Sequence, residues 1–584
     1  MAEKFLFTSE PARDGNPYMS VAVSGETFRL NSNYRPLAEA DTWAAGQQLA
    51  ETGAIVLLFG VGNGYFLRAL LKRLPQDAAV IAYEPSEELF RFVQSRYELG
   101  DLLSDRRLTL LTESIFRKQI YALLDRSIHW SNAKKQSVCI HPQYDRIFPE
   151  QLAFFEELIR ANNIRVYTNR NTEMHFGRSI ASNVALNMRY VPEAGTLSAL
   201  VGRFPPGASA ILVAAGPSLD KNVDELKKAE GRAFIIAVDT SLRTLHAHGV
   251  KPDAAVMIDA DIRQKYFTDT DFADIPLFAQ IQANHEIMRL HTTRKIWFDS
   301  HAYLKQYYHE IGRDMRDYHG GASVATAAFS VCAALGFRRI ILIGQDLSYH
   351  GDVTHAGGET MAIQAEEENL CYVDGTDGGK VKTRHDWLQY LRWYERVVQE
   401  TAGEIDVIDA TEGGALIRGT RLMTLSEAIE KYCTVPVDFA ALLRENLRTL
   451  SGEERKSLAK YLHRGILEAE KIRKLSQELC VLLDRESIAL ERTDARRADQ
   501  YCSERSAWLR GRIAERNALI ADCSVYPLVD DAIKQVSIPA ITEMLETEGT
   551  EKERCRVLIS ANRRLYRAMA EAAGELGEKL HYAM

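Results

Sequence analysis

The chain has 584 residues, of which 46% are hydrophobic and 26% charged, and these proportions exclude a mostly disordered or fibrous protein. The formal net charge of −8 gives no electrostatic reason to expect a nucleic acid as the main partner. The 8 cysteines include no C-x-x-C pair, which argues against both a disulfide framework and a zinc site. With no signal peptide recognised at the N-terminus and no apolar membrane span, we expect a soluble, cytoplasmic protein of about three or four domains.

The first third of the chain alternates strands with helices. A hairpin is predicted at 21–30 with Ser24 and Gly25 in its turn, and a helix at 42–51. Short apolar runs at 55–59, 79–83 and 108–111 predict buried strands separated by helices. This alternation indicates a doubly wound parallel sheet, and we assign residues 1–170 to a first Rossmann-like domain of the methyltransferase type.

The first of these strands runs into a glycine loop, G-V-G-N-G at 60–64, and Glu84 ends the next strand. Glycines allow a ligand to approach the backbone, and an acid about twenty residues on can accept hydrogen bonds from a ribose. The spacing is similar to that of S-adenosylmethionine methyltransferases; the alternative is a scaffold that transfers no methyl group. Asn16-Pro17-Tyr18 precedes the loop rather than following a later strand, so we expect no methylation.

A second α/β series predicts another Rossmann-like domain at 171–429. Its strands are expected at 210–215, 233–238, 254–258, 277–281, 340–343 and 405–408, with a charged helix up to Gly231, helices at 323–335 and 387–400, and a hairpin at 371–382. Beyond it, Ser451 and Glu454 form a capping-box pattern, and apolar residues recur every three or four positions from Leu458 to Leu482. Residues 430–584 are therefore predicted to form an all-α domain.

Polar turns follow the first two strands of the second series. Gly216-Pro217-Ser218 exposes backbone N–H groups, and Ser218 can cap a helix whose N-terminus favours an anion; the alternative is a plain strand-to-helix turn. Asp239 and Thr240 end the next strand. Because parallel sheets bind ligands at the carboxyl ends of their strands, both turns are expected to line one crevice.

Further turns of the same kind follow along the chain. Asp259 and Asp261 have the D-x-D form, which suits Mg²⁺ or Mn²⁺ against a diphosphate, or helix capping. Gly320 and Gly321 precede a helix that Ser323 opens, which forms a second backbone cradle. The last two turns are a polar cluster at 346–355 and a glycine turn at 410–415. Five of these six turns follow predicted strands of one domain, which indicates a binding site.

The motifs AAGPSLD, AVDTSL, HGGASVATAA, GQDLSY and DATEGGALI occur in this order. Together they resemble the motility-associated factor (Maf) family of flagellin glycosyltransferases over about 195–425, and the flanking domains match that family's layout. The resemblance implies a central domain related to a bacterial sialyltransferase and to an archaeal 6-hydroxymethylpterin diphosphokinase. It also implies transfer of a nonulosonic acid, pseudaminic or legionaminic, from its CMP-activated form to Ser or Thr of flagellin, in support of flagellum assembly and motility.

The resemblance implies roles for single residues. Asp346 belongs to a G-x-D element of the catalytic site, and the base is His350 or His355, with His355 preferred because it lies farther from the strand. Ser348 stands where relatives often have a tyrosine, and Tyr349 follows it. The residues expected to bind the nucleotide sugar are Gly216, Pro217, Ser218, Asp239, Thr240, Gly320, Gly321, Ser323, Ser348, Tyr349 and Thr411.

Three functions follow as hypotheses. A glycosyltransferase would need no metal or other cofactor, would use the CMP-sugar as its donor, and would recognise flagellin through the helical domain. A pterin diphosphokinase would need Mg²⁺ held by Asp259 and Asp261. A flagellin chaperone would need no active site. For an anionic sugar, Lys380, Lys382 and Arg384 on the predicted hairpin are candidate donors, the alternative being a solvated hairpin face.

Overall fold

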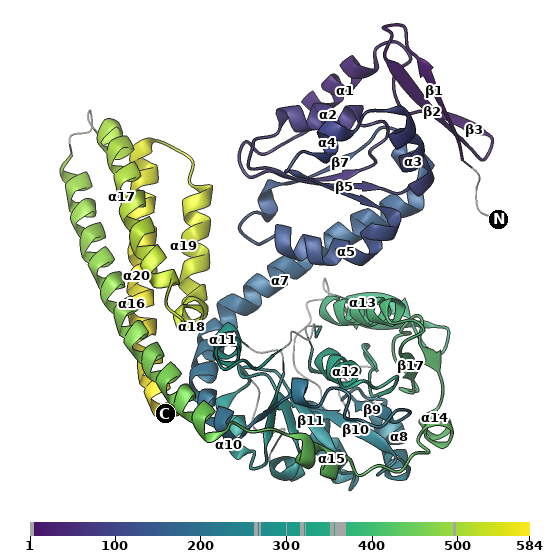
Figure 1. Cartoon of the computed structure of the whole chain (residues 1–584), viewed down its shortest axis with the longest axis vertical. Coiled ribbons are helices and arrows are strands. Elements are labelled where there is room, and N and C mark those ends of the chain that lie inside the picture. The colour runs from purple at the N-terminus through teal and green to yellow at the C-terminus, as the bar shows by residue number, and fades with distance from the viewer. Residues whose placement is uncertain are drawn as a thin grey trace. The chain divides into compact units, whose positions relative to one another are not determined.

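The computed structural model of the chain falls into two compact units, Met1–Thr172 and Glu173–Met584 (Figure 1). Each unit is described by itself. The structure describes residues 5–261, 267, 270–298, 301–315, 320–321, 323–350, 356, 370–493 and 498–584.

The first unit contains a four-stranded parallel sheet in the order β6-β5-β4-β7. These strands are β4 (Ile55–Phe59), β5 (Ala79–Glu84), β6 (Leu108–Thr112) and β7 (Gln136–Ile140). The connecting helices are α2 (Tyr65–Arg73), α3 (Glu87–Arg96), α4 (Gly100–Leu103), α5 (Glu113–Ser127) and α6 (Tyr144–Ile147). The three strands predicted here are confirmed, while β7 has too short an apolar run to have been predicted.

An antiparallel sheet precedes it, made of β1 (Leu6–Pro11), β2 (Pro17–Val23) and β3 (Glu26–Arg29). The predicted hairpin is confirmed, because Val23 pairs with Glu26 and both Ser24 and Gly25 have positive φ. The helix predicted at 42–51 is wrong in position: α1 is Pro36–Ala45, since Pro36 suits the first helical turn and Gly46 ends the helix. The 39-residue helix α7 (Pro149–Asn187) was not predicted, because its polar middle shows no apolar stripe.

The second unit is built on a nine-stranded parallel sheet with the order β18-β17-β14-β9-β10-β11-β12-β13-β8. Its strands are β8 (Gly195–Thr196), β9 (Ser209–Val213), β10 (Ala233–Val238), β11 (Ala254–Met257), β12 (Leu277–Ala279), β13 (Lys295–Trp297), β14 (Arg339–Ile343), β17 (Asp406–Asp409) and β18 (Arg421–Leu422). From β9 the chain winds outward to β13 and then returns to β14 on the other side of β9. The strand order therefore reverses between β9 and β14, which is where such sheets bind ligands.

Alternate side chains of each strand bury against helices on the two faces of this sheet. Ala210 and Leu212 of β9 face the layer of α12 (Val324–Leu335) and α13 (His385–Glu400), whereas Ile211 and Val213 face the opposite layer. The other helices of this part are α8 (Leu219–Asn222), α9 (Leu242–Ala247), α10 (His285–Leu290) and α11 (Ala302–Glu310), and the hairpin is β15 (Leu370–Asp374) with β16 (Lys380–Arg384). The charged helix predicted after β9 is wrong in form, because α8 is a single turn followed by the 3₁₀ segment Val223–Lys228.

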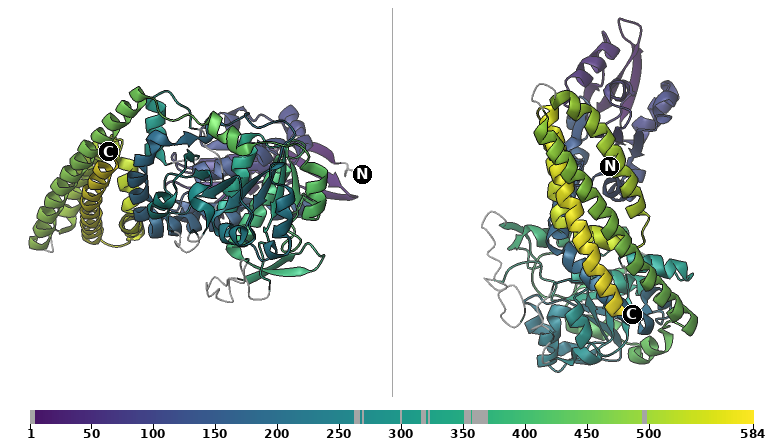
Figure 2. Two further views of the ribbon diagram at one scale, coloured as in Figure 1. Left: turned by 90° about the horizontal axis from the view of Figure 1, so that it is seen from below. Right: turned by 90° about the vertical axis from the view of Figure 1, so that its left-hand side faces the viewer.

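The C-terminal part is all helical, with α16 (Gly452–Arg492) and α20 (Glu551–Ala583) lying side by side (Figure 2). Ser451 and Glu454 form the predicted capping box. The remaining helices are α14 (Leu425–Tyr432), α15 (Phe439–Asn446), α17 (Ala498–Ala521), α18 (Tyr526–Ala532) and α19 (Lys534–Glu546). The predicted fold class, two Rossmann-like domains followed by a helical one, is confirmed.

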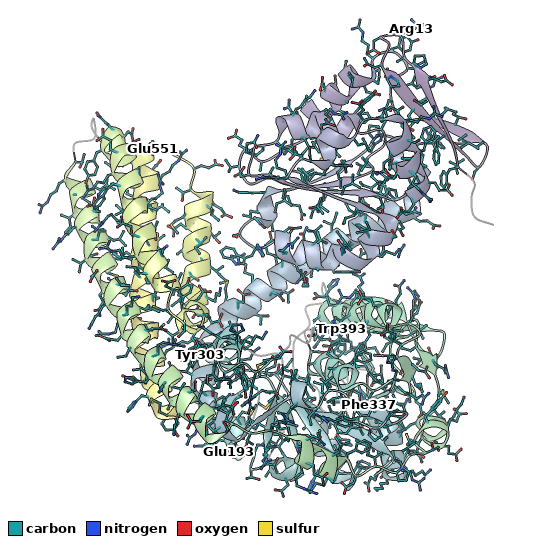
Figure 3. All side chains as sticks on the ribbon, in the orientation of Figure 1. Arg13, Glu193, Tyr303, Phe337, Trp393 and Glu551 are labelled. Atoms are coloured by element: carbon teal, nitrogen blue, oxygen red, sulfur yellow. The ribbon has the colours of Figure 1, made fainter. Side chains whose placement is uncertain are left out.

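The helical part shares its core with the second sheet. One cluster of buried side chains runs from Ile211 and Ile341 of the sheet to Leu479 of α16. At the junction, the Tyr461 hydroxyl donates a hydrogen bond of 2.7 Å to the carbonyl oxygen of Tyr303, the residue labelled on α11 in Figure 3. A chain cut near residue 430 would therefore expose part of this core. Within the ranges described, no helix is both long and apolar enough to cross a bilayer.

We expect Leu479→Ala to lower the free energy of unfolding of the second unit by about 2–5 kcal/mol, because the substitution leaves a cavity in the shared core. Val481→Ala, on the same helix but with 52% of the residue exposed, is the control and should change stability by less than about 0.5 kcal/mol. Chemical denaturation of the full-length variants measures both. Equal losses would contradict the assignment of this helix face to the core.

Candidate functional site

The turns after β9 and β14 are joined directly by hydrogen bonds. The Gly216 N–H donates to the Gly344 carbonyl oxygen over 2.7 Å. The Ser218 hydroxyl donates to Asp346 Oδ2 over 2.7 Å, and the Ser218 N–H lies 3.2 Å from Asp346 Oδ1. These contacts, called here the switch-point clasp, fix the two turns at the place where the strand order reverses. Ser218 therefore does not cap α8 as predicted, because its hydroxyl is bound to Asp346.

Glycine is required in the clasp for reasons of space. A Cβ atom on Gly216 would lie 1.9 Å from Asp346 Oδ2, and one on Gly344 would lie 2.4 Å from the Ala214 carbonyl oxygen. Gly344 also has φ +62°, which a residue with a side chain rarely adopts. Pro217 fills the position between Gly216 and Ser218, where no N–H is needed for the clasp. The short four-residue α8 offers no extended helix terminus for an anion, so the predicted helix-end site is replaced by the clasp.

The turn after β17 completes the clasp from the other side. The Ala415 N–H donates to the Asp346 carbonyl oxygen over 2.7 Å, and Gly414 lies so close that a Cβ would come within 2.4 Å of the same oxygen. Thr411 is fully buried, and its hydroxyl has no hydrogen-bond partner among the described residues. Asp409 Oδ2 is likewise buried without a partner there. Burial raises the pKa of Asp409 to about 6 and also raises the pKa of Asp346.

The polar pair after β10 also has an unused oxygen. Asp239 is 2% exposed; its Oδ1 accepts the Thr240 N–H over 2.7 Å, whereas Oδ2 has no partner in the described part of the chain. Burial, with the charge of Asp259 as a second cause, raises the pKa of Asp239 well above its ordinary value. Burial thus favours the protonated form of this carboxyl group.

The D-x-D pair is placed differently. Asp259 and Asp261 follow β11, and both residues are exposed. Among the described residues, no group of three or more His, Cys, Asp or Glu side chains is arranged to hold a metal ion.

Ser323 opens α12 as predicted, because its hydroxyl accepts the Thr326 N–H in a capping box. The adjacent Gly321 is held tightly, since a Cβ there would come within 2.6 Å of Thr326 Oγ1, whereas Gly320 is exposed. Because α12 leads back into β14, its N-terminus lies at the same edge of the sheet as the clasp. Its first-turn N–H at Thr326 is already satisfied by Ser323.

The segment after Asp346 is bound to the hairpin. Leu347 has φ +50°, and its carbonyl oxygen accepts the buried Thr383 hydroxyl over 2.7 Å. Ser348 is buried, and the Tyr349 N–H donates to the Lys382 carbonyl oxygen over 2.9 Å. His350 is exposed at the end of this segment. His355 lies outside the described residues.

Sequence reasoning missed the contribution of α13. Tyr394 is fully buried and its hydroxyl donates to Gln345 Oε1, within the turn after β14, over 3.2 Å. Two turns earlier on the same helix, Trp387 packs on Tyr349 with ring centroids 4.9 Å apart. The only available signal was the recurrence of aromatic residues at helical spacing, which is more often a mark of an ordinary core.

The glycine loop of the first unit is filled by the chain's own side chains. Glu84, fully buried, accepts the Tyr144 hydroxyl over 2.7 Å and the Val61 N–H over 3.0 Å. A Cβ on Gly60 would lie 2.3 Å from the Tyr144 ring, and one on Gly62 would lie 2.5 Å from His141 Nε2. The acid that would accept a ribose is thus bound to its own loop.

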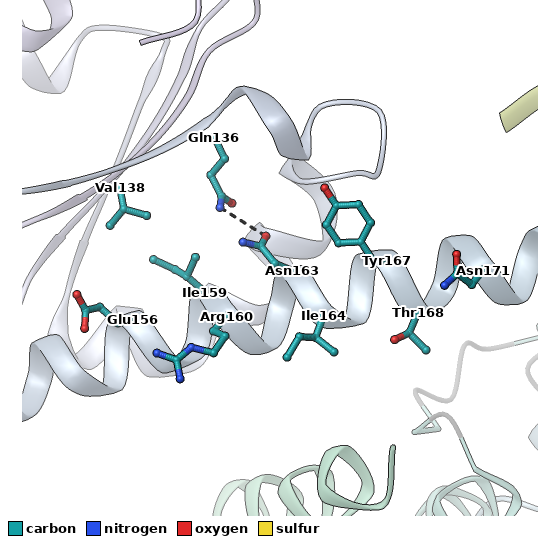
Figure 4. Close-up of a pocket in the computed structure, with 10 residues that line it drawn as sticks. All are labelled: Gln136, Val138, Glu156, Ile159, Arg160, Asn163, Ile164, Tyr167, Thr168 and Asn171. Atoms are coloured by element: carbon teal, nitrogen blue, oxygen red, sulfur yellow. Dashed lines mark hydrogen bonds between the residues drawn. The ribbon is translucent and has the colours of Figure 1, made fainter. Parts of the chain in front are cut away.

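A groove of about 710 Å³ lies elsewhere in the first unit, between the edge strand β7 and α7 (Figure 4). Its lining mixes apolar Val138 and Ile159 with amides such as Asn163. None of the residues of the clasp contributes to it. The candidate site is therefore the carboxyl edge of the second sheet, which is defined by hydrogen bonding rather than by this groove.

The fold defines a doubly wound α/β protein, and comparison with known proteins agrees with this class. Residues 182–352 match the family described as 6-hydroxymethylpterin diphosphokinase MptE-like. The structure of the Maf glycosyltransferase from Magnetospirillum magneticum AMB-1 is similar with a TM-score of 0.53 at 15% identity, over 94% of this chain and 95% of that one. The resemblance to the Maf family is thus confirmed in the fold.

Two uncharacterized proteins of Treponema pallidum (strain Nichols) are also similar in sequence. One is 23% identical over 340 residues, which cover 56% of this chain and 58% of the relative. The other is 26% identical over 124 residues, or 21% of this chain and 56% of the relative. The matches therefore span a little over half the length of these relatives.

Burial raises the pKa of Glu84 to about 7, from an ordinary value of 4.5. The folded state then binds the proton more tightly than the unfolded state does. The contribution of Glu84 to the free energy of unfolding is therefore full below pH 4.5, and it falls by on the order of 3 kcal/mol as the pH rises to about 7. Glu84→Gln should remove this fall. Hydrogen exchange of the β4 and β5 amides in the full-length chain, measured across this pH range, is the test.

The control is Glu87→Gln, because a hydrogen bond from Ser114 lowers the pKa of that exposed carboxyl. This variant should keep the wild-type fall in stability between pH 4.5 and 7. If Glu84→Gln and the wild type show the same pH dependence, Glu84 is not the titrating group of the glycine loop.

Proposed function

We propose that this protein is a glycosyltransferase that moves a nonulosonic acid, of the pseudaminic or legionaminic type, from its CMP-activated form to Ser or Thr hydroxyls of flagellin. The observation that carries the proposal is the switch-point clasp, which holds Ser218 and Asp346 where a doubly wound sheet binds its ligand. The fold shared with a protein described as a Maf glycosyltransferase supports the same activity. The transfer takes place in the cytoplasm, before flagellin is exported, and it serves flagellum assembly and motility.

Unused buried polar atoms around the clasp support a ligand there. Asp239 Oδ2, Asp409 Oδ2 and Thr411 Oγ1 are buried at strand ends without partners in the described chain. Such atoms cost free energy unless something binds them. Burial raises the pKa of both Asp239 and Asp409, so these carboxyl groups take on a negative charge less readily than exposed ones, which suits an anionic nucleotide sugar.

The transfer needs a base and a stabilised leaving group. The acceptor oxygen forms a bond to the anomeric carbon, the bond from that carbon to the phosphate oxygen breaks, and CMP leaves with the electron pair. The acceptor proton passes to His350 or His355, which follow the clasp in sequence. Hydrogen-bond donors stabilise the departing phosphate, so no metal or other cofactor is required.

The helical part is proposed to recognise flagellin. It presents long helices, α16 and α20, whose inner faces are packed and whose outer faces are mostly polar, with Leu467, Val481 and Ile488 of α16 exposed among the polar residues. Helical surfaces suit docking of another helix. If flagellin binds to the protein but gains no sugar mass, the protein is a flagellin chaperone without transfer activity.

A second candidate function is a Mg²⁺-dependent diphosphokinase acting on a pterin alcohol. The match of residues 182–352 to the MptE-like diphosphokinase family favours it. Exposed Asp259 and Asp261 would hold the metal against the diphosphate in that case. The long helical part, which a small pterin does not require, favours the glycosyltransferase instead.

We expect Gly216→Ala to weaken CMP binding by about tenfold or more, because the new methyl group would overlap Asp346 Oδ2 and open the clasp. Gly452→Ala, at a position with nothing within 4 Å of a new Cβ, is the control in the same unit and should bind like the wild type. Equilibrium titration with CMP measures both. Unchanged affinity in Gly216→Ala would place the nucleotide elsewhere.

The decisive measurement is the intact mass of flagellin co-expressed with the protein and a pathway for a CMP-nonulosonate. We expect added sugar mass with the wild type, also when purified components react in EDTA, and at least about a hundredfold slower transfer with Asp346→Ala because the clasp is lost. His350→Ala and His355→Ala, tested separately, identify the base as the variant with the larger loss of kcat. Unmodified flagellin together with Mg²⁺-dependent diphosphorylation of a pterin alcohol would favour the second candidate.

A further inference from the structure

Arg384 is a nearly buried cation beside the candidate site. It ends β16 and occupies the N-cap position of α13, and its side chain is 12% exposed. Its guanidinium lies 4.1 Å from the centre of the Trp387 ring. By contrast, Lys380 is paired with Asp374 and its side chain is 66% exposed, and Lys382 is also exposed. The alternative of a solvated hairpin face therefore describes the two lysines but not Arg384.

One hydrogen-bond donor of Arg384, Nε, is buried without an acceptor among the described residues. Its Nε lies 2.8 Å from Asp386 Oδ1, an ion pair whose geometry is not that of a hydrogen bond, so Nε has no acceptor among the described residues. No other acidic side chain in the described ranges pairs with this guanidinium. A guanidinium carries five N–H donors, and burying even one of them without an acceptor costs free energy. The chain has therefore placed a planar, charged donor group where it can bind an anion.

Arg384 faces the crevice rather than an unrelated surface. Its neighbour Thr383 is bound to the Leu347 carbonyl oxygen, in the residue that follows Asp346 of the clasp. On its other side, Tyr390 interacts electrostatically with both Arg384 and Asp259, so the first turns of α13 reach the end of β11. Arg384 thus lies next in the chain to a residue bound beside β14, and close enough to Tyr390 to act on it electrostatically, as Asp259 after β11 also does.

We infer that Arg384 is the anion-binding group of this crevice, and that its guanidinium takes a carboxylate or phosphate oxygen of the bound substrate. The first turn of α13 adds free backbone N–H groups beside it, since no side chain caps that helix. Stacking on Trp387, itself packed on Tyr349, holds the guanidinium plane in place. The identification of the anion as part of a nucleotide sugar rests on the proposed function, whereas the anion subsite does not.

The test compares the full-length wild type with Arg384→Gln, Arg384→Lys and the control Lys382→Gln, all checked for unchanged melting. The probes are CMP, cytidine, N-acetylneuraminate, its methyl ester and inorganic phosphate, titrated at equilibrium. Arg384→Gln should weaken binding of the recognised anion about tenfold, the size of a lost charge-assisted hydrogen bond, and leave the neutral probes unchanged. Arg384→Lys should recover only part of the affinity, because it keeps the charge and loses the planar fork.

The two anion sources give different results. A loss for CMP but not cytidine assigns the phosphate, and a loss for N-acetylneuraminate but not its methyl ester assigns the carboxylate. If the wild type binds inorganic phosphate through Arg384 but binds neither CMP nor the acidic sugar, the anion subsite stands and the proposed function fails. Equal affinities of the wild type and Arg384→Gln for every anion, or no anion binding by the wild type, would overturn the inference. A loss equal to that of Lys382→Gln would also overturn it, because it would reflect only general surface charge.

Discussion

The hydrogen bond from Ser218 to Asp346 is the constraint on which the geometry of the second unit's crevice depends. It joins residues 128 positions apart, just beyond the carboxyl ends of two adjacent parallel strands. Burial raises the pKa of the Asp346 carboxyl group. The hydrogen bonds from the Ser218 hydroxyl and from the Ser218 N–H oppose this rise. Close packing of Gly216, Gly344 and Gly414 around it leaves no room for side chains. Asp346 also positions the turn after β17 and the segment that leads to the hairpin.

The two Rossmann-like units use the same local pattern with opposite results. Each has a glycine turn after one strand and an acid after the next, Glu84 in the first unit and Asp239 in the second. Glu84 is satisfied by its own loop and by Tyr144, and the space beside the glycines is occupied. Asp239 keeps one buried oxygen free of partners in the described chain. The first unit is thus a closed version of a site that the second unit leaves open.

Side chains from distant parts of the sequence decide what this open site can bind. The helix α13 brings Tyr394 to Gln345, and its first turns bring Arg384 and Trp387 beside Tyr349. The helical part is fastened to the other face of the same sheet through a continuous core that includes Tyr303 and Tyr461. The site and the helical surface are therefore carried by one rigid body of packed side chains, which suits a protein that binds a small ligand and a polypeptide together.

The sequence by itself determined the strands with long apolar runs, the glycine turns and the helical character of the C-terminal part, because these depend on local periodicity and on residues such as Gly, Ser and Asp with strong conformational preferences. It also predicted that Ser218, Asp239 and Asp346 would lie at one edge, since strand ends in a parallel sheet share an edge. Only the tertiary structure decided that Ser218 binds Asp346 rather than capping a helix, that Tyr144 and His141 fill the first glycine loop, and that Arg384 is buried while Lys382 is exposed. Each of these depends on contacts between residues far apart in the chain, and local sequence carries no information about which of several equally suitable partners will arrive.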